Sequence, residues 1–419
     1  MSLDLVVVGL GYVGLPLAAR ACEAGLTTAG LDISDAVVEG LNAGRSHVGD
    51  VPHGAVAELL ASGFRAGTDP AVIGTADTVV ICVPTGLSTD GEPELAAVRS
   101  AARAVADHLR PGMLVVLEST SHPGTTEETV RPILEERSGL IVGSDFHLVF
   151  SPERIDPGNA SFGVRNTPKV VGGVTPLCAK YGATFYSRFV DAVVVARGTR
   201  EAELAKLLEN TYRYVNIALV NEVAQFCDQV NIDVWDVLRC AGTKPFGYVP
   251  FDPGPGVGGH CIPIDPLYLA SKAREEGFTF DVLDAARAVN DRMPQHVVGR
   301  AEELLQEREK PIQGARVLLL GVTYKRDVAD TRESPAFPVA RELMRRGAEV
   351  LFHDPYVNSF TVDGSDMSKV DDVDAGLASA DLAILLQAHA EYGTGALSRS
   401  ACLLLDTRGV AAGERVARI

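Results

Sequence analysis

Short apolar runs alternate with glycine turns and alanine-rich stretches at the start of the chain. Residues 5–8 are apolar and lead into Gly9-x-Gly11-x-x-Gly14; an alanine-rich helical pattern and a second apolar run follow, and that run ends in Asp32. Glycines at this spacing permit a tight turn and let a ligand approach the backbone, and the N-terminus of the next helix offers free N–H groups to a pyrophosphate. The pattern predicts a strand–turn–helix–strand unit that binds a dinucleotide.

Asp32 indicates which dinucleotide this unit binds. An acid that closes the second strand is placed to hold the ribose hydroxyls, and its charge would repel the additional phosphate of NADP. The glycine motif alone is a weak signal, but here a strand precedes it, a helix follows it and Asp32 stands at the expected distance. We therefore predict NAD as the cofactor, against the alternative of a purely structural turn.

Three further apolar runs, at 76–85, 112–120 and 146–154, end in small polar or charged residues. In a doubly wound sheet, ligands collect at the carboxyl ends of the strands, so these ends are candidate contacts. Their polar residues could instead cap the helices that follow, and capping and ligand contact can coexist. The positions are Thr85, Glu118, Thr120 and Glu153.

Residues 199–230 carry apolar side chains at helical spacing for about nine turns. A helix of this length after a completed α/β unit is typical of a spine between domains, and such a helix often doubles as a dimer interface. Lys206 and Asn210 stand four residues apart and share one face of it. From spacing alone, this pair is either part of a site or an exposed lysine beside a solvated neighbour.

Near residue 311 the strand, glycine turn and helix pattern begins again, and the next strand ends in Asp354. This repetition predicts a second Rossmann-like domain. It lacks the GxGxxG motif, so its switch point need not bind a dinucleotide. Lys325, Arg326 and Arg332 crowd its first loop and suggest phosphate contacts.

Together these elements predict an α/β protein with two Rossmann-like, doubly wound domains joined by a long central helix. We expect an N-terminal NAD-binding domain over residues 1–196 and a central helical domain over residues 197–298. A C-terminal Rossmann-like domain is expected over residues 310–419.

The composition narrows the functional class. The chain has 419 residues, is 46% hydrophobic, and contains no run near the ~18 apolar residues of a spanning helix, so no membrane partner is expected. It starts without a basic, signal-like segment, so we expect a cytoplasmic location. A net charge of −17 argues against a nucleic-acid partner. The seven cysteines form no CxxC pair, so we expect neither a disulfide framework nor a metal site.

One cysteine lies in a loop that suits a reactive thiol. The stretch GPGVGGHCIPIDP, residues 254–266, surrounds Cys261 with glycines and prolines and places Asp265 four residues later. A structural cysteine needs only an apolar hole, whereas a reactive thiol must stay open to a substrate. Beside an NAD site, such a thiol suggests aldehyde oxidation through a thiohemiacetal and then a thioester that water hydrolyses. Candidates for stabilising the oxyanion and for directing water and protons are Lys206, Asn210, Asp265 and Glu153.

Two other functional classes fit parts of the pattern. A simple Rossmann dehydrogenase acting on a hydroxy acid, with one hydride transfer and no covalent step, would leave Cys261 and the second Rossmann-like domain unused. A dinucleotide-sensing or scaffold protein that kept the fold would have no need of the reactive residues Cys261, Lys206, Asn210 and Asp265.

Six motifs span the chain nearly from end to end: GLGYVGLP, ESTSHPGTTEE, FSPERIDPGN, LAKLLENTYRYVNIALVNE, GPGVGGHCIPIDP and VTYKRDVADTRESPA. In this combination and order the chain resembles the UDP-glucose/UDP-N-acetylhexosamine 6-dehydrogenase family. The resemblance implies an NAD-dependent, four-electron oxidation of a nucleotide sugar's C6 hydroxyl to a carboxylate, in polysaccharide or secondary-metabolite sugar biosynthesis. It also implies a C-terminal domain that binds the nucleotide sugar and a homodimer formed through the long helix.

The resemblance also assigns catalytic roles, residue by residue. The family's nucleophile falls on Cys261, its water-assisting aspartate on Asp265 and its oxyanion-stabilising lysine on Lys206. Asn210 is that lysine's companion. The family's Pro-Glu glutamate and its water-positioning threonine are Glu153 and Thr120.

The ligand contacts follow in the same way. The implied NAD contacts are Gly9, Gly11, Tyr12, Val13, Gly14, Asp32, Thr85, Thr120 and Arg332. The implied nucleotide-sugar contacts are Glu153, Arg154, Lys206, Asn210, Pro250, Phe251, Asp252, Pro253, Gly254, Gly258, Lys325 and Arg408.

Two local features bear on the sugar. Pro157 stands where glucose-type members carry a second acid, and Ile264 stands where they have a lysine before the catalytic aspartate. Both features resemble the N-acetylhexosamine branch. Three stretches resemble its UDP-N-acetylglucosamine 6-dehydrogenases in particular: PTGLSTDGEPEL, ESTSHPGTTEE and FSPERIDPGN. We therefore predict UDP-GlcNAc as substrate, with UDP-glucose or dTDP-glucose as the alternative. The stretch LSTDGEP, residues 87–93, departs from the longer, more basic version expected in that branch.

Overall fold

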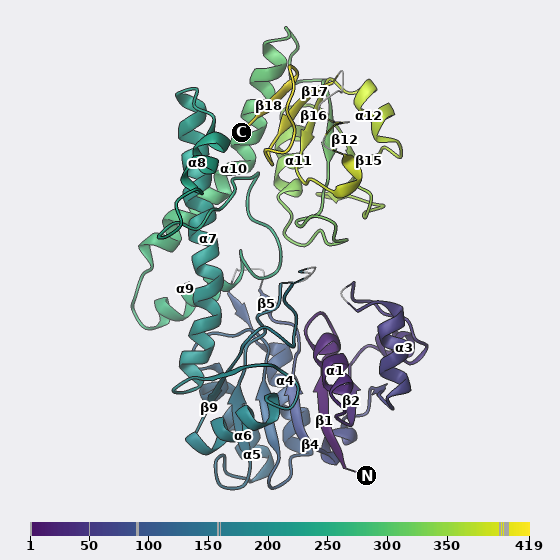
Figure 1. Cartoon of the computed structure of the whole chain (residues 1–419), viewed down its shortest axis with the longest axis vertical. Helices are drawn as coiled ribbons and strands as arrows, with labels where there is room; N and C mark the ends of the chain where they lie inside the picture. Colours follow the sequence, from purple (N-terminus) through teal and green to yellow (C-terminus); the bar gives the residue numbers. More distant parts are fainter. Residues whose placement is uncertain are drawn as a thin grey trace. The chain divides into compact units, whose positions relative to one another are not determined.

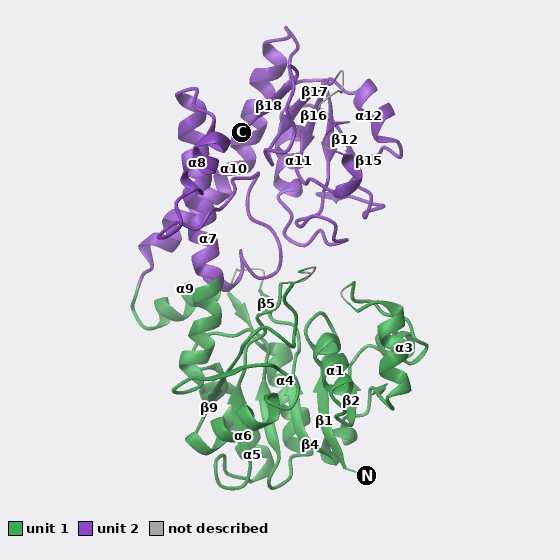
Figure 2. Cartoon of the chain, viewed as in Figure 1, with its two compact units in different colours: residues 1–209, 267–278 green, residues 210–266, 279–419 purple. Residues whose placement is uncertain are grey.

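The structure is a computed structural model that describes residues 2–49, 51–88, 92–156, 159, 161–393, 395, 397 and 402–419. The chain divides into two compact units, shown in green and purple in Figure 2. The N-terminal unit comprises residues 1–209 and 267–278, and the C-terminal unit comprises residues 210–266 and 279–419. The three-part division expected from the sequence stays a prediction. Pro157 and residues 89–91, which bear on the predicted sugar, lie outside the described residues.

The N-terminal unit is built on a sheet whose described strands are ordered β10 (Val193–Val195), β9 (Lys169–Gly173), β8 (His147–Phe150), β7 (Leu114–Leu117), β4 (Ala76–Ile81), β1 (Leu3–Val8), β2 (Thr28–Leu31) and β3 (Arg65–Gly67). The pairs are parallel except for β8 with β9, which is antiparallel. The order reverses between β1 and β4, because β2 and β3 extend to one side and β7 and β8 to the other. In Figure 1, β2 accordingly lies beside β1, and β9 lies beyond β4. In doubly wound sheets this reversal is where ligands bind.

The central strands are apolar on both faces because helices cover the sheet. All four residues of β7 are buried, as are the last four of β1. The helices are α1 (Gly14–Glu23), α2 (Asp35–Asn42), α3 (His53–Ala61), α4 (Ala96–Asp107), α5 (Arg131–Ser138) and α6 (Pro176–Tyr186), with a π-helical turn over Thr125–Val130. A small hairpin of β5 (Gly86–Leu87) and β6 (Pro93–Glu94) contacts α9 (Asp265–Glu275), where the Tyr268 hydroxyl donates to the Gly86 carbonyl at 2.6 Å.

The long helix expected over residues 199–230 is confirmed as α7 (Thr199–Gln229). Some of its side chains are buried, such as Leu207 and Ala224. Five large apolar side chains of α7 are instead 42 to 59% exposed, at spacings of four or seven residues that place them along one stripe. They are Leu204, Leu208, Tyr212, Leu219 and Phe226.

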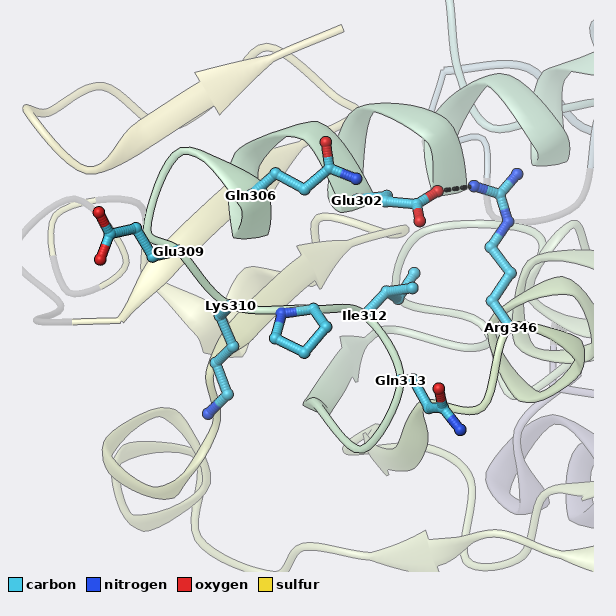
Figure 3. A pocket seen from close by; sticks show the side chains of 8 residues that line it. Glu302, Gln306, Glu309, Lys310, Ile312, Gln313 and Arg346 are labelled. Atoms are coloured by element: carbon cyan, nitrogen blue, oxygen red, sulfur yellow. Dashed lines mark hydrogen bonds and ion pairs between the residues drawn. The ribbon is translucent and has the colours of Figure 1, made fainter.

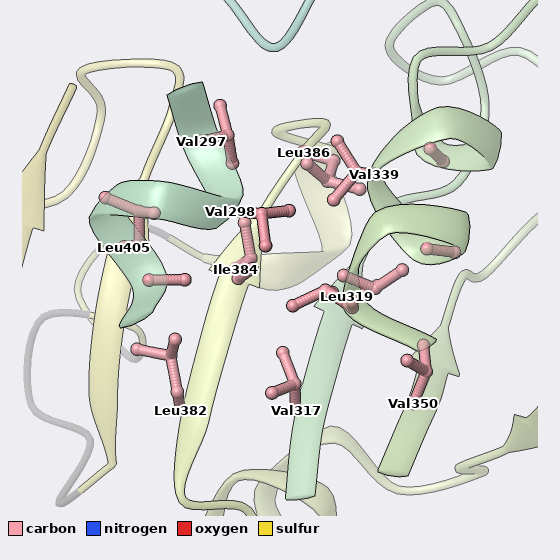
Figure 4. Packing of buried hydrophobic residues seen from close by; sticks show 14 of the residues in the cluster. Val297, Val298, Val317, Leu319, Val339, Val350, Leu382, Ile384, Leu386 and Leu405 are labelled. Atoms are coloured by element: carbon pink, nitrogen blue, oxygen red, sulfur yellow. The ribbon is translucent and has the colours of Figure 1, made fainter. Parts of the chain in front are cut away.

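The C-terminal unit contains a second parallel sheet, whose described strands are ordered β15 (Ser368–Lys369), β12 (Glu349–His353), β11 (Arg316–Leu320), β16 (Leu382–Leu385), β17 (Leu403–Asp406) and β18 (Val416–Arg418). Helices α10 (Asp281–Gln306) and α11 (Ala336–Arg345) cover one face, where Val297 and Val339 pack with Leu319 (Figure 4). Its neighbour Leu318 joins a second apolar cluster that includes Leu377 of α12 (Val373–Ser379), since successive strand residues point to opposite faces. The second Rossmann-like fold expected from the sequence is confirmed.

The first turns of the two sheets share one hydrogen-bond pattern. In the N-terminal unit, Leu10 N–H donates to an Asp32 carboxylate oxygen at 2.9 Å, after a glycine, Gly9, with φ +91°. In the C-terminal unit, Val322 N–H donates to an Asp354 carboxylate oxygen at 2.7 Å, after a glycine with φ +78°. A left-handed φ suits glycine because it has no Cβ. The acids differ in access: Asp32 is half-buried, whereas Asp354 is fully buried.

Candidate functional site

The glycine turn at β1 has the geometry of a phosphate cradle. A Cβ on Gly14 would lie 1.9 Å from the Gly9 carbonyl oxygen, and one on Gly9 would lie 2.6 Å from the Cys82 carbonyl oxygen, so both positions require glycine. A Cβ on Gly11 would meet nothing within 4 Å, which leaves open space beside the start of α1. The residue before that helix, Val13, makes no capping hydrogen bond with its side chain, so the helix start remains available to an anion.

The backbone fixes the Asp32 carboxylate. One of its oxygens accepts from Leu10 N–H at 2.9 Å, and the other accepts from Ser34 N–H at 2.9 Å. These bonds orient a half-buried carboxylate whose remaining lone pairs can accept ribose hydroxyls. The glycine cradle, the helix start and this acid fit the pyrophosphate and ribose of NAD.

We expect that Asp32→Ala weakens NAD binding about 10- to 100-fold, since hydrogen bonds to a charged group are worth roughly 1.5–3 kcal/mol. Calorimetric titration with NAD measures the change. Asp35→Ala is the matched control, because Asp35 is an exposed acid at the start of α2, three residues further on. Equal affinity of Asp32→Ala and Asp35→Ala would contradict the assignment.

The carboxyl ends of the other strands differ in how open they are. Thr85 is buried and Thr120 is half-buried. Next to it, the Ser121 hydroxyl is fully buried and has no hydrogen-bond partner among the described residues. Glu118 is not open to a ligand, because it is fully buried against Lys169 of β9 and Tyr186 of α6.

Glu153 follows β8 and is held by the backbone of its own loop. One carboxylate oxygen accepts from the N–H groups of Arg154 at 2.7 Å and Ile155 at 2.6 Å. The other lies 3.5 Å from the Lys169 ammonium. Burial opposes ionisation, but Lys169 and the two N–H groups outweigh it, so the pKa of Glu153 lies below its usual value. Arg154 itself is paired with Glu209 at 2.8 Å.

The first half of α7 carries buried polar groups. Lys206 and Asn210 are only 8% and 6% exposed, so the alternative of a solvated pair does not describe them. Within the C-terminal unit, the Asn210 side-chain amide donates to a carboxylate oxygen of Asp265 at 2.5 Å. Asp265 N–H in turn donates to the Cys261 carbonyl at 2.9 Å. Cys261 is exposed, while Asp265 is buried. The structure therefore brings together three residues of the predicted catalytic set.

The loop before Cys261 is tied down by amides. Gly254 N–H donates to the Asn221 side-chain oxygen at 2.9 Å, and the Asn221 amide donates to Asn290 of α10 at 3.0 Å. A Cβ on Gly254 would lie 2.9 Å from the guanidinium of Arg408, so the two predicted substrate contacts meet here. No sequence signal pointed to Asn221 and Asn290, because amides in helices carry no distinctive spacing.

Arg408 is held in a fixed position. Its Nε donates to the Leu386 carbonyl at 2.6 Å, and its N–H donates to Asp406 at 2.7 Å. Burial lowers the pKa of Arg408 to about 10, against the opposing charges of Asp406 and Asp252, so the side chain stays cationic at neutral pH.

The other predicted contacts in the C-terminal unit lie in the loop before Cys261, residues 250–258, and in the loop after β11, which contains Lys325 and Arg332. Arg332 forms a two-pronged pair with Asp330, at 2.6 to 3.1 Å, and its carbonyl accepts from Gly259 N–H at 3.1 Å. A Cβ on Gly258 would lie 2.7 Å from the Glu333 carbonyl oxygen. Pro250 and Asp252 are exposed, Pro253 is buried, and Phe251 and Lys325 are half-buried. Tyr12, predicted to contact NAD in the N-terminal unit, is 43% exposed.

A cavity of about 620 Å³ lies elsewhere on the C-terminal unit (Figure 3). Its lining comes from the end of α10 and the turn that follows, which includes Lys310, and from Arg346 at the end of α11. Both cations are paired, with Asp381 and Glu302 respectively. None of the predicted site residues lines it. Within the described part of the chain, no helix has the length and apolarity needed to cross a membrane.

Family models match the chain in three consecutive pieces. The NAD binding domain of the UDP-glucose/GDP-mannose dehydrogenase family matches residues 3–190. The central domain of that family matches residues 200–292, and its UDP binding domain matches residues 318–413.

Individual proteins give the same picture. The UDP-N-acetyl-D-mannosamine dehydrogenase of Salmonella typhi is 33% identical over 399 residues, which cover 92% of this chain and 93% of that protein. The structure of a UDP-D-ManNAc dehydrogenase from Pyrococcus horikoshii has a TM-score of 0.90 at 31% identity and covers 99% of both chains. That of a UDP-glucose dehydrogenase from Pyrobaculum islandicum has a TM-score of 0.87 at 30% identity and covers 100% of this chain and 97% of that one.

Proposed function

The chain belongs to the UDP-glucose/GDP-mannose dehydrogenase family, and from that premise we propose that it oxidises the C6 hydroxyl of a UDP-N-acetylhexosamine to a carboxylate. It is an NAD-dependent nucleotide sugar dehydrogenase with an NAD-binding and a UDP-binding domain. The observation that carries the proposed covalent chemistry is the cluster in the C-terminal unit, where Asn210 donates to buried Asp265 and the Asp265 N–H donates to the carbonyl of exposed Cys261.

Cys261 is the proposed nucleophile. The first oxidation removes a hydride from C6 and a proton from its hydroxyl and leaves an aldehyde. The Cys261 thiolate adds to the aldehyde carbon and leaves an oxyanion, and loss of a second hydride from this thiohemiacetal oxyanion gives a thioester. Water then attacks the thioester carbon, and cleavage of the C–S bond releases the acid and regenerates the thiolate. NAD supplies the oxidising power: two NAD⁺ and one water are consumed per sugar, and two NADH and three protons are released.

The remaining catalytic residues act on charge and water in this proposal. Lys206 and Asn210 stabilise the oxyanion of the tetrahedral species, since an ammonium and an amide both donate hydrogen bonds to it. Asp265 and Glu153 direct the attacking water and take its proton, with Thr120 as a further hydrogen-bond partner of that water.

Binding of the two ligands is divided among the predicted contacts. Gly9, Gly11, Tyr12, Val13, Gly14, Asp32, Thr85, Thr120 and Arg332 contact NAD in this proposal. Lys325 and Arg408 bind the charged nucleotide end of the substrate, and residues 250–254 together with Gly258 line the sugar nucleotide. The exposed apolar stripe on α7 supports a homodimer, because a contiguous apolar surface is stabilised by burial against a second copy.

The choice of an N-acetylhexosamine has two supports. The motif around Glu153 resembles that of UDP-GlcNAc dehydrogenases, and Ile264 is typical of the N-acetylhexosamine branch. The Salmonella typhi relative is named for UDP-N-acetyl-D-mannosamine. These sugars differ in configuration at C2, which is remote from the C6 chemistry, so either fits the proposed mechanism. UDP-glucose is the second candidate, favoured by the similarity to the Pyrobaculum islandicum UDP-glucose dehydrogenase. The alternative of dTDP-glucose stays a prediction from the sequence.

The test is NADH formed per sugar consumed, measured with UDP-GlcNAc, UDP-ManNAc, UDP-GalNAc, UDP-glucose and dTDP-glucose. We expect two NADH per sugar with an acid product, and the highest kcat/KM with an N-acetylhexosamine. One NADH per sugar would contradict the thioester route. A preference for a glucose nucleotide would contradict only the choice of sugar.

A further inference from the structure

Lys169 lies at the centre of a buried group of charged side chains in the N-terminal unit. Its ammonium forms an ion pair with Glu118 and lies 5.2 Å from the centre of the Tyr186 ring. The Tyr186 hydroxyl donates to the other oxygen of Glu118 at 2.7 Å. The Lys169 side chain is 6% exposed and that of Glu118 is fully buried. Each polar atom of this group is therefore partnered inside the protein.

The same ammonium reaches the site. Lys169 lies 3.5 Å from one carboxylate oxygen of Glu153, whose other oxygen is held by the backbone N–H groups of Arg154 and Ile155. The Glu153 side chain is 14% exposed, so it is the member of the group that faces outward. The ammonium thus joins a buried carboxylate on one side to a site carboxylate on the other.

A purely structural role does not account for this arrangement. Replacing a buried ion pair with well-packed apolar residues is often neutral or stabilising, so stability alone gives little reason to keep one. Here one ammonium also faces two carboxylates. A single cation stabilises one negative charge more easily than two, and the more buried carboxylate loses more solvation when it ionises.

The protonation preferences of the two acids differ accordingly. Burial raises the pKa of Glu118, and Lys169 and the Tyr186 hydroxyl only partly offset this. The pKa of Glu153 is lowered, as described above. The other titratable groups facing this cluster are the Cys82 thiol and the Tyr186 phenol, and burial raises the pKa of both, so they stay neutral.

We propose that Lys169, held in place by Glu118 and Tyr186, is a positioning residue that fixes the carboxylate of Glu153 and keeps it charged. This role of Lys169 rests on the proposed function, in which Glu153 directs water. Lys169 itself contacts neither substrate nor cofactor in this proposal. When the two carboxyl groups hold one proton between them, that proton is on Glu118. Glu153 then remains ionised and can act as a base.

The variants are chosen to keep buried charges balanced. Lys169→Met alone would leave Glu118 buried beside no cation, so the test uses the double variant Glu118→Gln/Lys169→Met. Glu118→Gln alone is its reference, because it retains the ammonium and removes the second carboxylate. Lys169→Arg tests rescue by another cation. If the double variant does not fold, Glu118→Gln/Lys169→Gln replaces it, since glutamine keeps an N–H donor without the charge.

The measurement is the titration of Glu153 itself, followed by the infrared band of its protonated carboxyl group. The spectrum of the same variant carrying Glu153→Gln is subtracted to isolate that band. In Glu118→Gln we expect Glu153 to titrate below its ordinary value of about 4.3, and in the double variant at least one pH unit higher than in that reference. Identical titrations in the two variants would overturn the inference.

Turnover provides the second readout. We expect the acid limb of kcat against pH to lie at least one pH unit higher in the double variant than in Glu118→Gln, so that kcat at pH values below that limb falls up to tenfold. In Lys169→Arg, kcat at the same pH should stay within about threefold of the wild type, since one pKa unit at a site carboxylate changes its ionised fraction up to tenfold at pH below the pKa. Loss of activity in Lys169→Arg equal to that of the double variant would also overturn the inference. A third outcome separates the two proposals. If the titration of Glu153 shifts in the double variant but Glu153→Gln is fully active, Lys169 controls the charge of Glu153 and Glu153 has no catalytic role.

Discussion

Exchange of Cys261 for serine is expected to lower the rate of acid formation by about 10³-fold or more. A serine hydroxyl ionises far less readily than a thiol, so little nucleophile would be present to trap the aldehyde. Removal of a nucleophile generally eliminates most of the catalysis that its partners support. The first hydride transfer does not need the thiol, so the variant should yield at most one NADH per sugar, measured with product analysis by mass spectrometry.

Cys240→Ser is the matched control for this experiment. Like Cys261, Cys240 is an exposed cysteine of the C-terminal unit; it lies on α8 (Val234–Ala241) and belongs to no predicted site. It should retain two NADH per sugar and near-normal kcat. Acid formation by Cys261→Ser at a rate close to that of Cys240→Ser would contradict the covalent route and favour a dehydrogenase without a thioester.

Asp265→Asn is expected to slow the release of the acid by about 10²- to 10⁴-fold, the usual contribution of a general base. Asparagine has nearly the same shape, and its carbonyl oxygen can still accept from Asn210, so folding should be preserved. Since the thioester then forms but is not hydrolysed, we expect a burst of two NADH per active site followed by slow turnover. Intact-protein mass spectrometry should detect the sugar nucleotide bound covalently at Cys261.

The control for this variant is Asp281→Asn. Asp265 and Asp281 both lie in the first turn of a helix, α9 and α10 respectively, so both substitutions remove one favourable interaction with a helix N-terminus. Only Asp265 lies in the cluster with Cys261 and Asn210. If turnover of Asp265→Asn is reduced but neither the burst nor the covalent adduct is seen, then Asp265 acts in forming the thioester rather than in hydrolysing it.

Local sequence was sufficient to predict the dinucleotide turn. Gly9, Gly14 and Asp32 lie within one strand–helix–strand unit, so their contacts depend on short-range geometry that the glycine spacing already specifies. The long helix was predictable for a similar reason, because its apolar period persists over residues 199–230.

The cluster around Lys169 was beyond prediction from the sequence. Lys169 and Glu118 are 51 residues apart, and they meet because β9 lies beside β8, which in turn lies beside β7. The antiparallel pairing of β9 brings its first residue, Lys169, to this place, and no motif signals that reversal. The sequence placed Glu118 among candidate ligand contacts, but the burial that removes it from ligands depends on α6, a later element. Tertiary packing, rather than local propensity, therefore determines the position of Lys169 and the burial of Glu118.

The repeated turn at Gly9 and Gly321 bears on how such chains are surveyed. A search for a strand, a left-handed glycine and an acid at the end of the next strand would count two dinucleotide receptors in this protein. At the second of these turns, His389 lies 3.2 Å from the Asp354 carboxylate, and Tyr356 N–H donates to that carboxylate at 2.8 Å. Asp354 therefore connects segments of the protein to one another. The same backbone pattern is thus proposed to serve recognition in one sheet, whereas it serves architecture in the other. The exposure of one carboxylate, rather than the motif, distinguishes the two uses.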